Sequence, residues 1–297
     1  MYSAPEGSDM GPLTWHNRPE LRKPALVCAF EGWNDAAGSA TSAVEFLAGQ
    51  WGAEPLATID RGEFIDFQTT RPVVKLTEGR TREIEWPQIE LFSASLAAAD
   101  RDVVFLSGVE PNLRWRTFCE TVVSAARELG VELVVTLGAL LASVPHTRPV
   151  PITGIAGDPE LVERLGFSET RYEGPTGITG VLHDTCVRAE LVSASLWAPV
   201  PHYVAAVPSP KAALALVRRL GDLLEVVLDV AELEEASTEY ERRLDEAVRG
   251  EPEVRALVER LEEQADEEDA LPGDLPSGDS IANEFQRFLR QRGRQEG

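Results

Sequence analysis

The stretch Pro24-Ala-Leu-Val-Cys-Ala-Phe-Glu-Gly-Trp-Asn-Asp-Ala-Ala-Gly-Ser-Ala-Thr-Ser-Ala-Val-Glu-Phe-Leu47 decides the fold class. Residues 25–30 form an apolar run without alternation, which is typical of a strand buried on both faces. Small and apolar residues then follow at helical spacing, and Asn34 or Asp35 can cap that helix. The stretch therefore predicts a strand–loop–helix unit whose polar loop lies where open α/β sheets bind ligands.

The rest of the chain repeats this alternation of apolar strands and amphipathic helices. It predicts an α/β fold with a three-layer, mostly parallel sheet flanked by helices. Between residues 61 and 87 a long polar excursion predicts either a hairpin or a lid. The expected strands are residues 25–30, 54–60, 89–92, 102–108, 131–137, 151–157 and 201–207, and the expected helices cover 114–129, a start at 158–159, a segment through about 192, and 210–230.

Composition limits the class of protein. The chain has 297 residues, of which 43% are hydrophobic and 26% charged, so it can bury a large core as one domain with an appendage or as two domains. No apolar run reaches the roughly 18 residues of a membrane span, and the first residues lack a signal pattern, which predicts a cytoplasmic protein with no membrane partner. A net charge of −22 argues against nucleic acid as a partner.

Four segments follow from changes in composition along the chain. We expect a flexible N-terminal arm at residues 1–23, in which Leu13 and Trp15 can dock locally, and an α/β domain at 24–230. An acidic helical appendage follows at 231–269, since residues 232–269 hold 16 acidic and 5 basic residues with apolar residues at helical spacing. This pattern predicts two helices around a break at 250–252. Residues 270–297 read as a linker and an amphipathic helix from Ile281 to Leu289.

Five motifs occur in a characteristic order: Phe30-Glu-Gly-Trp-Asn-Asp-Ala-Ala-Gly38, Gly108-Val-Glu-Pro-Asn112, Val144-Pro-His-Thr-Arg-Pro-Val-Pro-Ile-Thr-Gly154, Gly174-Pro-Thr-Gly-Ile-Thr-Gly-Val-Leu182, and Leu196-Trp-Ala-Pro-Val-Pro-His-Tyr-Val204 continuing to Pro208-Ser-Pro-Lys211. Together they resemble the PAC2 family, named for a proteasome assembly chaperone, over roughly residues 24–230. The acidic helices and the final helix resemble its actinobacterial branch. The resemblance implies a phosphorylase- or hydrolase-like α/β fold and frequent oligomerisation, and it implies no known reaction.

Glu31, Trp33 and Asp35 follow the first strand, and Glu110 and Asn112 follow a later one. If the two loops meet at one sheet edge, two neighbouring acids can split their pKa values and act in acid–base chemistry or bind a metal. The alternatives are helix capping by Asn34 or Asp35, packing by Trp33, and an ordinary turn at residues 110–112.

His146 and Arg148 add positive character after the strand predicted at 131–137, and they are the best candidates for contacting an anionic group. A proline-stiffened loop that merely covers the core is the alternative. Thr176 and Gly177 offer backbone N–H groups at a helix start, which suits anion binding, although close packing explains the glycines equally well. His202 is expected inside a strand as a satisfied core histidine.

Isolated Cys28, Cys119 and Cys186 predict buried reduced thiols, and the four histidines show no zinc-binding spacing. Neither a phosphate-binding glycine motif nor a nucleophile elbow occurs, so we expect no cofactor and no metal, and the sequence leaves open whether the protein is an enzyme. Two hypotheses follow. The first is an oligomeric protein-interaction or assembly-chaperone-like protein, a homo-oligomer with a proteasome-related partner. The second is an enzyme or small-ligand binder that acts on a nucleoside or anionic substrate.

Overall fold

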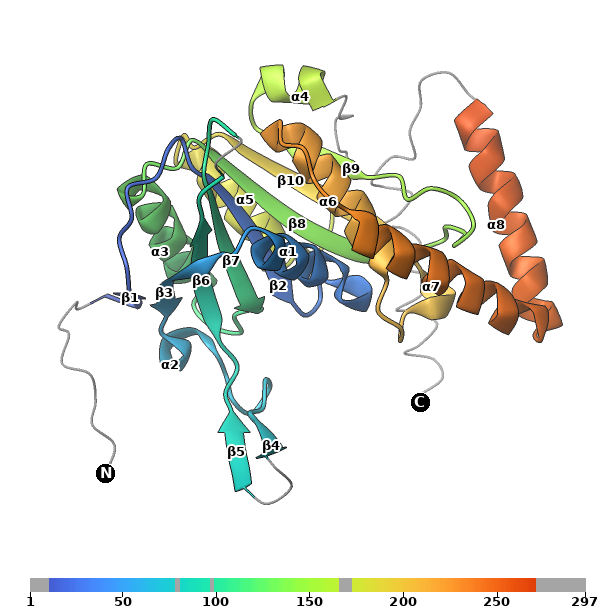
Figure 1. Ribbon diagram of the computed structural model, residues 1–297, viewed down its shortest axis with the longest axis horizontal. Coiled ribbons are helices and arrows are strands. Elements are labelled where there is room, and N and C mark those ends of the chain that lie inside the picture. Colours follow the sequence, from blue (N-terminus) through green and yellow to red (C-terminus); the bar gives the residue numbers. More distant parts are fainter. Residues whose placement is uncertain (1–10, 78–80, 97–98, 166–172, 271–297) are drawn as a thin grey trace.

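The computed structural model describes residues 11–77, 81–96, 99–165 and 173–270. These residues form an eight-stranded mixed sheet in the order β1-β3-β6-β7-β2-β8-β10-β9, and five of the strands run in the same direction. Helices cover both faces of this sheet (Figure 1). The α/β class with a three-layer, mostly parallel sheet is confirmed.

The first predicted strand lies at the centre of the sheet. β2 (Ala25–Glu31) pairs in parallel with β7 (Val103–Val109) on one side and with β8 (Leu133–Ala142) on the other. Every residue of β2 before Glu31 is buried, as the unalternating apolar run predicts. β10 (Ser193–Pro201) continues the parallel part beyond β8.

Antiparallel strands complete both edges. β6 (Ile89–Ala94), β3 (Glu54–Ile59) and β1 (Leu13–Trp15) follow β7 on one side, and β9 (Thr153–Ala156) pairs with β10 on the other. β1 falls within the range predicted as a flexible arm, and Leu13 and Trp15 dock by strand pairing with β3. This part of the predicted arm is therefore an edge strand.

Two pairs of helices fill the outer layers. α1 (Ser39–Gln50) and α6 (Pro210–Leu224) cover one face, and α3 (Trp115–Glu128) and α5 (Ile178–Arg188) cover the other. Alternate residues of β2 contribute to the two cores, so that Val27 belongs to the α1–α6 side and Cys28 to the α3–α5 side. All three cysteines are buried free thiols, as predicted.

Residues 61–87 form a short helix and a hairpin. α2 (Arg61–Phe64) is followed by β4 (Val73–Thr77) and β5 (Thr81–Glu85), which pair only with each other within the described chain. The hairpin alternative is therefore the correct one. It extends away from the main sheet (Figure 1). Three short elements occur elsewhere: η1 (Ala36–Gly38), α4 (Pro159–Leu165) and η2 (His202–Val204).

The acidic region is a pair of helices, α7 (Ala231–Arg249) and α8 (Pro252–Ala270), with the break where the sequence predicts it. α7 packs against α6, and its buried residues include Leu233, Tyr240 and Leu244. α8 returns alongside the body (Figure 1). The amphipathic helix predicted at 281–289 lies outside the described residues.

The strand predicted at 201–207 is wrong. The strand is β10, it ends at Pro201, and residues 202–204 form η2, so His202 lies in a helical turn rather than in a strand. Proline is a poor strand residue, which hides this element in the sequence. β9 pairs with β10 only over residues 194–197. On that side of β10, Pro199 and Pro201 therefore face no strand that would require a hydrogen bond from their backbone nitrogens.

Three boundaries also differ. β8 continues to Ala142 instead of ending at Leu137, because β10 pairs with it over that whole length. α5 ends at Arg188 instead of about 192, and α6 ends at Leu224 instead of Val230. Glu225 terminates α6 in the left-handed region, with φ 59°.

Candidate functional site

Three loops meet around Glu110, which follows β7. One of its carboxylate oxygens, Oε1, accepts a hydrogen bond from the backbone N–H of Ile178 at 2.9 Å, at the start of α5. Its own N–H donates to the carbonyl oxygen of Glu31 at 2.8 Å, and its Oε2 lies 3.4 Å from the backbone nitrogen of Trp33. The loops after β2 and β7 do converge, and α5 begins beside them. We call Glu110 with these partners the Glu110 cluster.

The N-terminus of α5 already holds an anion in the form of the Glu110 carboxylate. Such a carboxylate satisfies a free N–H and complements the positive end of the helix dipole. A Cβ on Gly177 would lie 2.0 Å from the Asn34 side-chain oxygen and 2.9 Å from Glu110 Oε1. Close packing against these two side chains therefore explains the glycine. Thr176 is exposed in the loop just before α5.

Asp35 caps α1. Its Oδ1 accepts hydrogen bonds from the backbone N–H groups of Ala40 at 2.6 Å and Thr41 at 3.3 Å, and its Oδ2 accepts from the Thr41 hydroxyl. Burial raises the pKa of Asp35, and these hydrogen bonds oppose the increase. The geometry agrees with the capping interpretation of this acid.

Glu31 and Trp33 have more open surroundings than Asp35. Trp33 is 45% exposed, and Glu31 lies at the exposed end of β2. Partial desolvation raises the pKa of Glu31, and the negative charges of Glu45 and Asp35 raise it further. Beside them, the side-chain oxygen of Asn34 is buried and has no hydrogen-bond partner in the described structure.

Asn112 does not join this group. Its side-chain oxygen accepts hydrogen bonds from the Asp66 N–H at 2.9 Å and the Thr70 hydroxyl at 3.2 Å, and its backbone N–H donates to the Phe64 carbonyl at 2.9 Å. Asn112 therefore fastens the segment between α2 and the hairpin.

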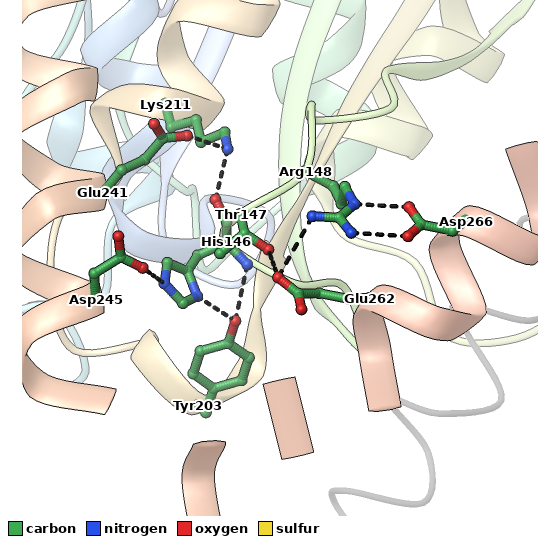
Figure 2. A network of polar contacts seen from close by, with 9 residues as sticks. All are labelled: His146, Thr147, Arg148, Tyr203, Lys211, Glu241, Asp245, Glu262 and Asp266. Carbon is green, nitrogen blue, oxygen red and sulfur yellow. Dashed lines mark hydrogen bonds and ion pairs between the residues drawn. The ribbon is translucent and has the colours of Figure 1, made fainter. Parts of the chain in front are cut away.

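His146 lies in a different network (Figure 2), and only 2% of it is exposed. Its Nδ1 and its backbone nitrogen each lie 2.8 Å from the Tyr203 hydroxyl, and its Nε2 lies 3.3 Å from Asp245 Oδ1 on α7. This geometry assigns the tautomer: the hydroxyl accepts from the backbone N–H and donates to Nδ1, so that Nε2–H donates to Asp245. Burial lowers the pKa of His146, and it raises that of Tyr203 to about 12. The imidazole is therefore neutral at pH 7.

Arg148 and Thr147 bind α8 (Figure 2). Nε and one terminal nitrogen of Arg148 contact the two carboxylate oxygens of Asp266 at 2.7 and 2.8 Å, which is a bidentate pair. Its other terminal nitrogen lies 3.4 Å from Glu262 Oε1, which also accepts from the Thr147 hydroxyl. We call residues 146–148 the docking loop.

Lys211, at the start of α6, completes the network. It donates to the carbonyl oxygen of His146 at 2.5 Å and forms an ion pair with Glu241 on α7 (Figure 2). The sequence does not predict the roles of Tyr203, Lys211 and the four acids Glu241, Asp245, Glu262 and Asp266 in this network. The excess of acids in α7 and α8 is evident in the sequence. The docking loop, however, is separated from its partners Asp245, Glu262 and Asp266 by 99 to 118 residues, and no local pattern indicates their pairing.

The candidate residues thus form two groups rather than one crevice. Glu31, Trp33, Asp35 and Glu110 surround the junction of β2, β7 and α5. The polar contacts of His146 and Arg148 go instead to η2, α6, α7 and α8. The anionic groups that His146 and Arg148 contact are carboxylates of this chain itself. Within the described ranges, no group of three or more His, Cys, Asp or Glu side chains has a geometry that could hold a metal ion.

A search of the described helices for membrane spans found none with the necessary length and apolar content.

Comparisons with known proteins give the family. The PAC2 family model matches residues 29–248. A crystal structure described as a Mycobacterium tuberculosis proteasome-assembly chaperone homologue, Rv2125, is 45% identical, with a TM-score of 0.73, over 79% of this chain and 99% of that one. A PAC2 family protein from Streptomyces avermitilis matches with the same identity, TM-score and coverage.

A third structure, the M. tuberculosis protein of unknown function Rv2714, is 27% identical, with a TM-score of 0.81, over 89% of this chain and 92% of that one. The comparison with curated proteins found no match. The family model spans more than half of the sequence. Two solved structures share the fold and are 45% identical to this chain over 99% of their own length. The chain therefore belongs to the PAC2 family.

Proposed function

We propose that this protein is an oligomeric protein-interaction protein of the assembly-chaperone type, and that it presents the α7–α8 pair as part of its interaction surface. One observation carries the proposal: the polar side chains at the strand ends mainly make internal contacts. Asp35 caps α1, Glu110 caps α5, and the docking loop binds α7 and α8. Side chains held in this way support the α7–α8 pair on the α/β body.

The partner class comes from the 45% identical relative, which is described as a proteasome-assembly chaperone homologue. We therefore propose a proteasome-related protein as the partner, together with self-association of this chain. The alignment covers 99% of that relative's length and 79% of this chain, so the similarity extends over the whole of the solved relative.

The test measures, by biolayer interferometry, the binding of purified proteasome core particles to the immobilised full-length protein. We expect saturable binding that weakens in Arg148→Ala, because this change releases α8 from the docking loop. Arg188→Ala is the matched control, since Arg188 forms a comparable Arg–Asp pair with Asp184 within α5, away from α7 and α8. The proposal would be contradicted if no binding were detected up to about 100 μM particles, since the binding free energy would then be weaker than about −5.5 kcal/mol.

A second candidate function is favoured by the surroundings of Glu31. This carboxylate has a raised pKa beside the exposed Trp33 ring and the unpartnered Asn34 oxygen, which are features of a small-ligand site. A thermal-shift screen with nucleosides, inorganic phosphate and divalent metal ions tests it. A shift in the wild type that disappears in Glu31→Gln would support a ligand site here, and no shift with any compound would remove this candidate.

A further inference from the structure

One side of the β4–β5 hairpin is mainly apolar. In the antiparallel register Val74 lies opposite Ile84. Leu76 lies opposite Arg82 two positions further along, so all four side chains share one side of the ribbon. Trp86 follows Ile84 by two positions and continues this alternation toward the base of the ribbon. We call these five residues the hairpin face.

The apolar part of the hairpin face is exposed. Val74 is 57% exposed, Leu76 66% and Ile84 54%. The ribbon extends away from the main sheet (Figure 1), and it is anchored at its base, where the Trp86 and Phe67 ring centroids lie 5.0 Å apart. An antiparallel ribbon with such alternation normally packs its apolar side on a core, and exposed apolar patches of this kind mark interaction sites.

The charges that border this apolar strip are positive. Arg82 is the charged residue of the hairpin face, and at the base the Arg61 guanidinium lies over the Trp86 ring, 5.4 Å from its centroid. Within the described part of the chain, neither guanidinium has a carboxylate partner. The acids of the two strands, Glu83 and Glu85, lie on the opposite side of the ribbon. The hairpin face therefore combines exposed apolar side chains with two unpaired cations.

The two guanidinium groups mark the two ends of the apolar strip. Arg82 and Trp86 are four residues apart, which corresponds to about 13 Å of strand, and the exposed Ile84 lies between them. Guanidinium groups bind carboxylates, often through two parallel hydrogen bonds, and burial of the apolar strip adds a hydrophobic contribution.

We propose that the hairpin face binds an apolar segment of another protein that carries a carboxylate at each end. This surface is distinct from the α7–α8 pair in the proposed function, and its own charges and apolar residues give the chemistry of the partner. A face built on two strands of five residues is much smaller than the roughly 800 Å² per partner of a standard interface, so we expect a weak contact.

Charge disfavours the other occupants of the hairpin face. Two such faces from separate copies would bring guanidinium groups of the same sign together. Residues 281–297 hold four arginines and two glutamates, so the C-terminal segment is cationic as well. A membrane rich in anionic lipids repels a chain with a net charge of −22. A short partner segment interacts mainly with the charges of the face itself, because more distant charges are screened.

The experiment measures, by fluorescence polarisation, the binding of labelled peptides to the full chain at low salt. The probe peptide has three leucines between two glutamates, and the control peptide has glutamines in place of the glutamates. We expect the wild type to bind the glutamate peptide with a dissociation constant below about 300 μM, and the glutamine peptide at least fivefold more weakly.

Two matched pairs of variants identify the side of the ribbon that binds. Arg82→Ala should weaken binding of the glutamate peptide at least fivefold, whereas Lys75→Ala removes the same charge from the opposite side and should have no effect. Val74→Ser should weaken binding of both peptides. Val73→Ser should not, although Val73 is as exposed as Val74, because it lies on the opposite side. Circular dichroism checks that all four variants are folded.

Each other outcome overturns the inference in a recognisable way. No binding of the glutamate peptide up to about 300 μM protein, or equal losses in the two variants of a pair, excludes this partner chemistry. If the peptide does not bind, self-association that Val74→Ser abolishes assigns the face to a second copy, and binding to phosphatidylserine vesicles assigns it to a membrane. Peptide binding that occurs only in Phe285→Asp assigns the face to the C-terminal segment. The measurement contains no proteasome, so either proposal can fail while the other stands.

Discussion

The Glu110 cluster and the docking loop differ in what they join. Both lie after parallel strands of the sheet, and in both a carboxylate accepts hydrogen bonds from backbone or side-chain N–H groups. The Glu110 cluster joins two loops and a helix of the same α/β body, next to the buried Asn34 and Gly177. The docking loop joins that body to α7 and α8, through Arg148 and Asp266 side chains that are 34% and 57% exposed.

The difference separates contacts that define the α/β fold from contacts that attach α7 and α8 to it. A close-packed junction has no room for change and is little affected by salt, whereas exposed ion pairs are screened and contribute little stability. Disturbing the first should destabilise the whole body, and breaking the second should loosen α8 while the body stays folded.

Gly177→Ala should have the largest effect. The new Cβ would lie 2.0 Å from the Asn34 side-chain oxygen, and Asn34 is itself buried. We expect a loss of about 2–3 kcal/mol in the free energy of unfolding, the usual cost of overpacking, measured by urea denaturation. The matched control is Gly49→Ala within α1, where a Cβ would meet nothing within 4 Å. It should stabilise the protein by about 0.5–1 kcal/mol. A neutral Gly177→Ala would show that the junction is loosely packed.

The pH dependence of His146 should have an intermediate effect. Burial lowers its pKa, while Asp245 and Glu241 oppose this and Lys211 adds to it. Below an unfolded pKa of about 6.5 the unfolded state binds more protons, so stability is full above that pH and falls as pH decreases toward the folded pKa. The free energy of unfolding should therefore decrease from pH 7.5 to 5.5, and it should decrease less in His146→Gln.

His183 has a lowered pKa as well and contributes with the same sign, but it is present in both proteins. The difference between the two pH profiles isolates His146. If the free energy of unfolding changed equally with pH in the wild type and in His146→Gln, the histidine would titrate alike in the folded and unfolded states. That result would contradict a lowered pKa caused by its burial under α7.

Much of the fold was predictable because its signals are local. The buried run at residues 25–30, the cap at Asp35, the cap at Ser209 and the break before Pro252 all read directly from residue type and spacing. Prolines hid β10, because strand propensity argues against a strand that ends Pro-Val-Pro. Pairing with β8 along its whole length, and with β9 over residues 194–197, stabilises it.

The candidate site was harder to predict, because the strand order determines which loops come together. The meeting of the Glu31 and Glu110 loops follows from the adjacency of β2 and β7, which the sequence does not encode locally. The partners of His146 and Arg148 depend on α7 and α8 folding back over the body. Residue type led to the prediction that Arg148 contacts an anionic group of a ligand; in the structure its partners are carboxylates of this chain, and a ligand contact stays a prediction.

The most direct test of the account is a double-mutant cycle on Arg148 and Asp266, with amide hydrogen exchange of α8 as the measurement. Each single alanine variant should accelerate exchange in α8 and leave that of β2 and β8 unchanged. The double variant should exchange no faster than Arg148→Ala alone, because Arg148 also contacts Glu262, and about 0.5 M salt should reproduce the effect in the wild type. Additive effects of the two substitutions, or accelerated exchange throughout the body, would contradict the claim that the docking loop fastens α8 to an independently stable α/β body.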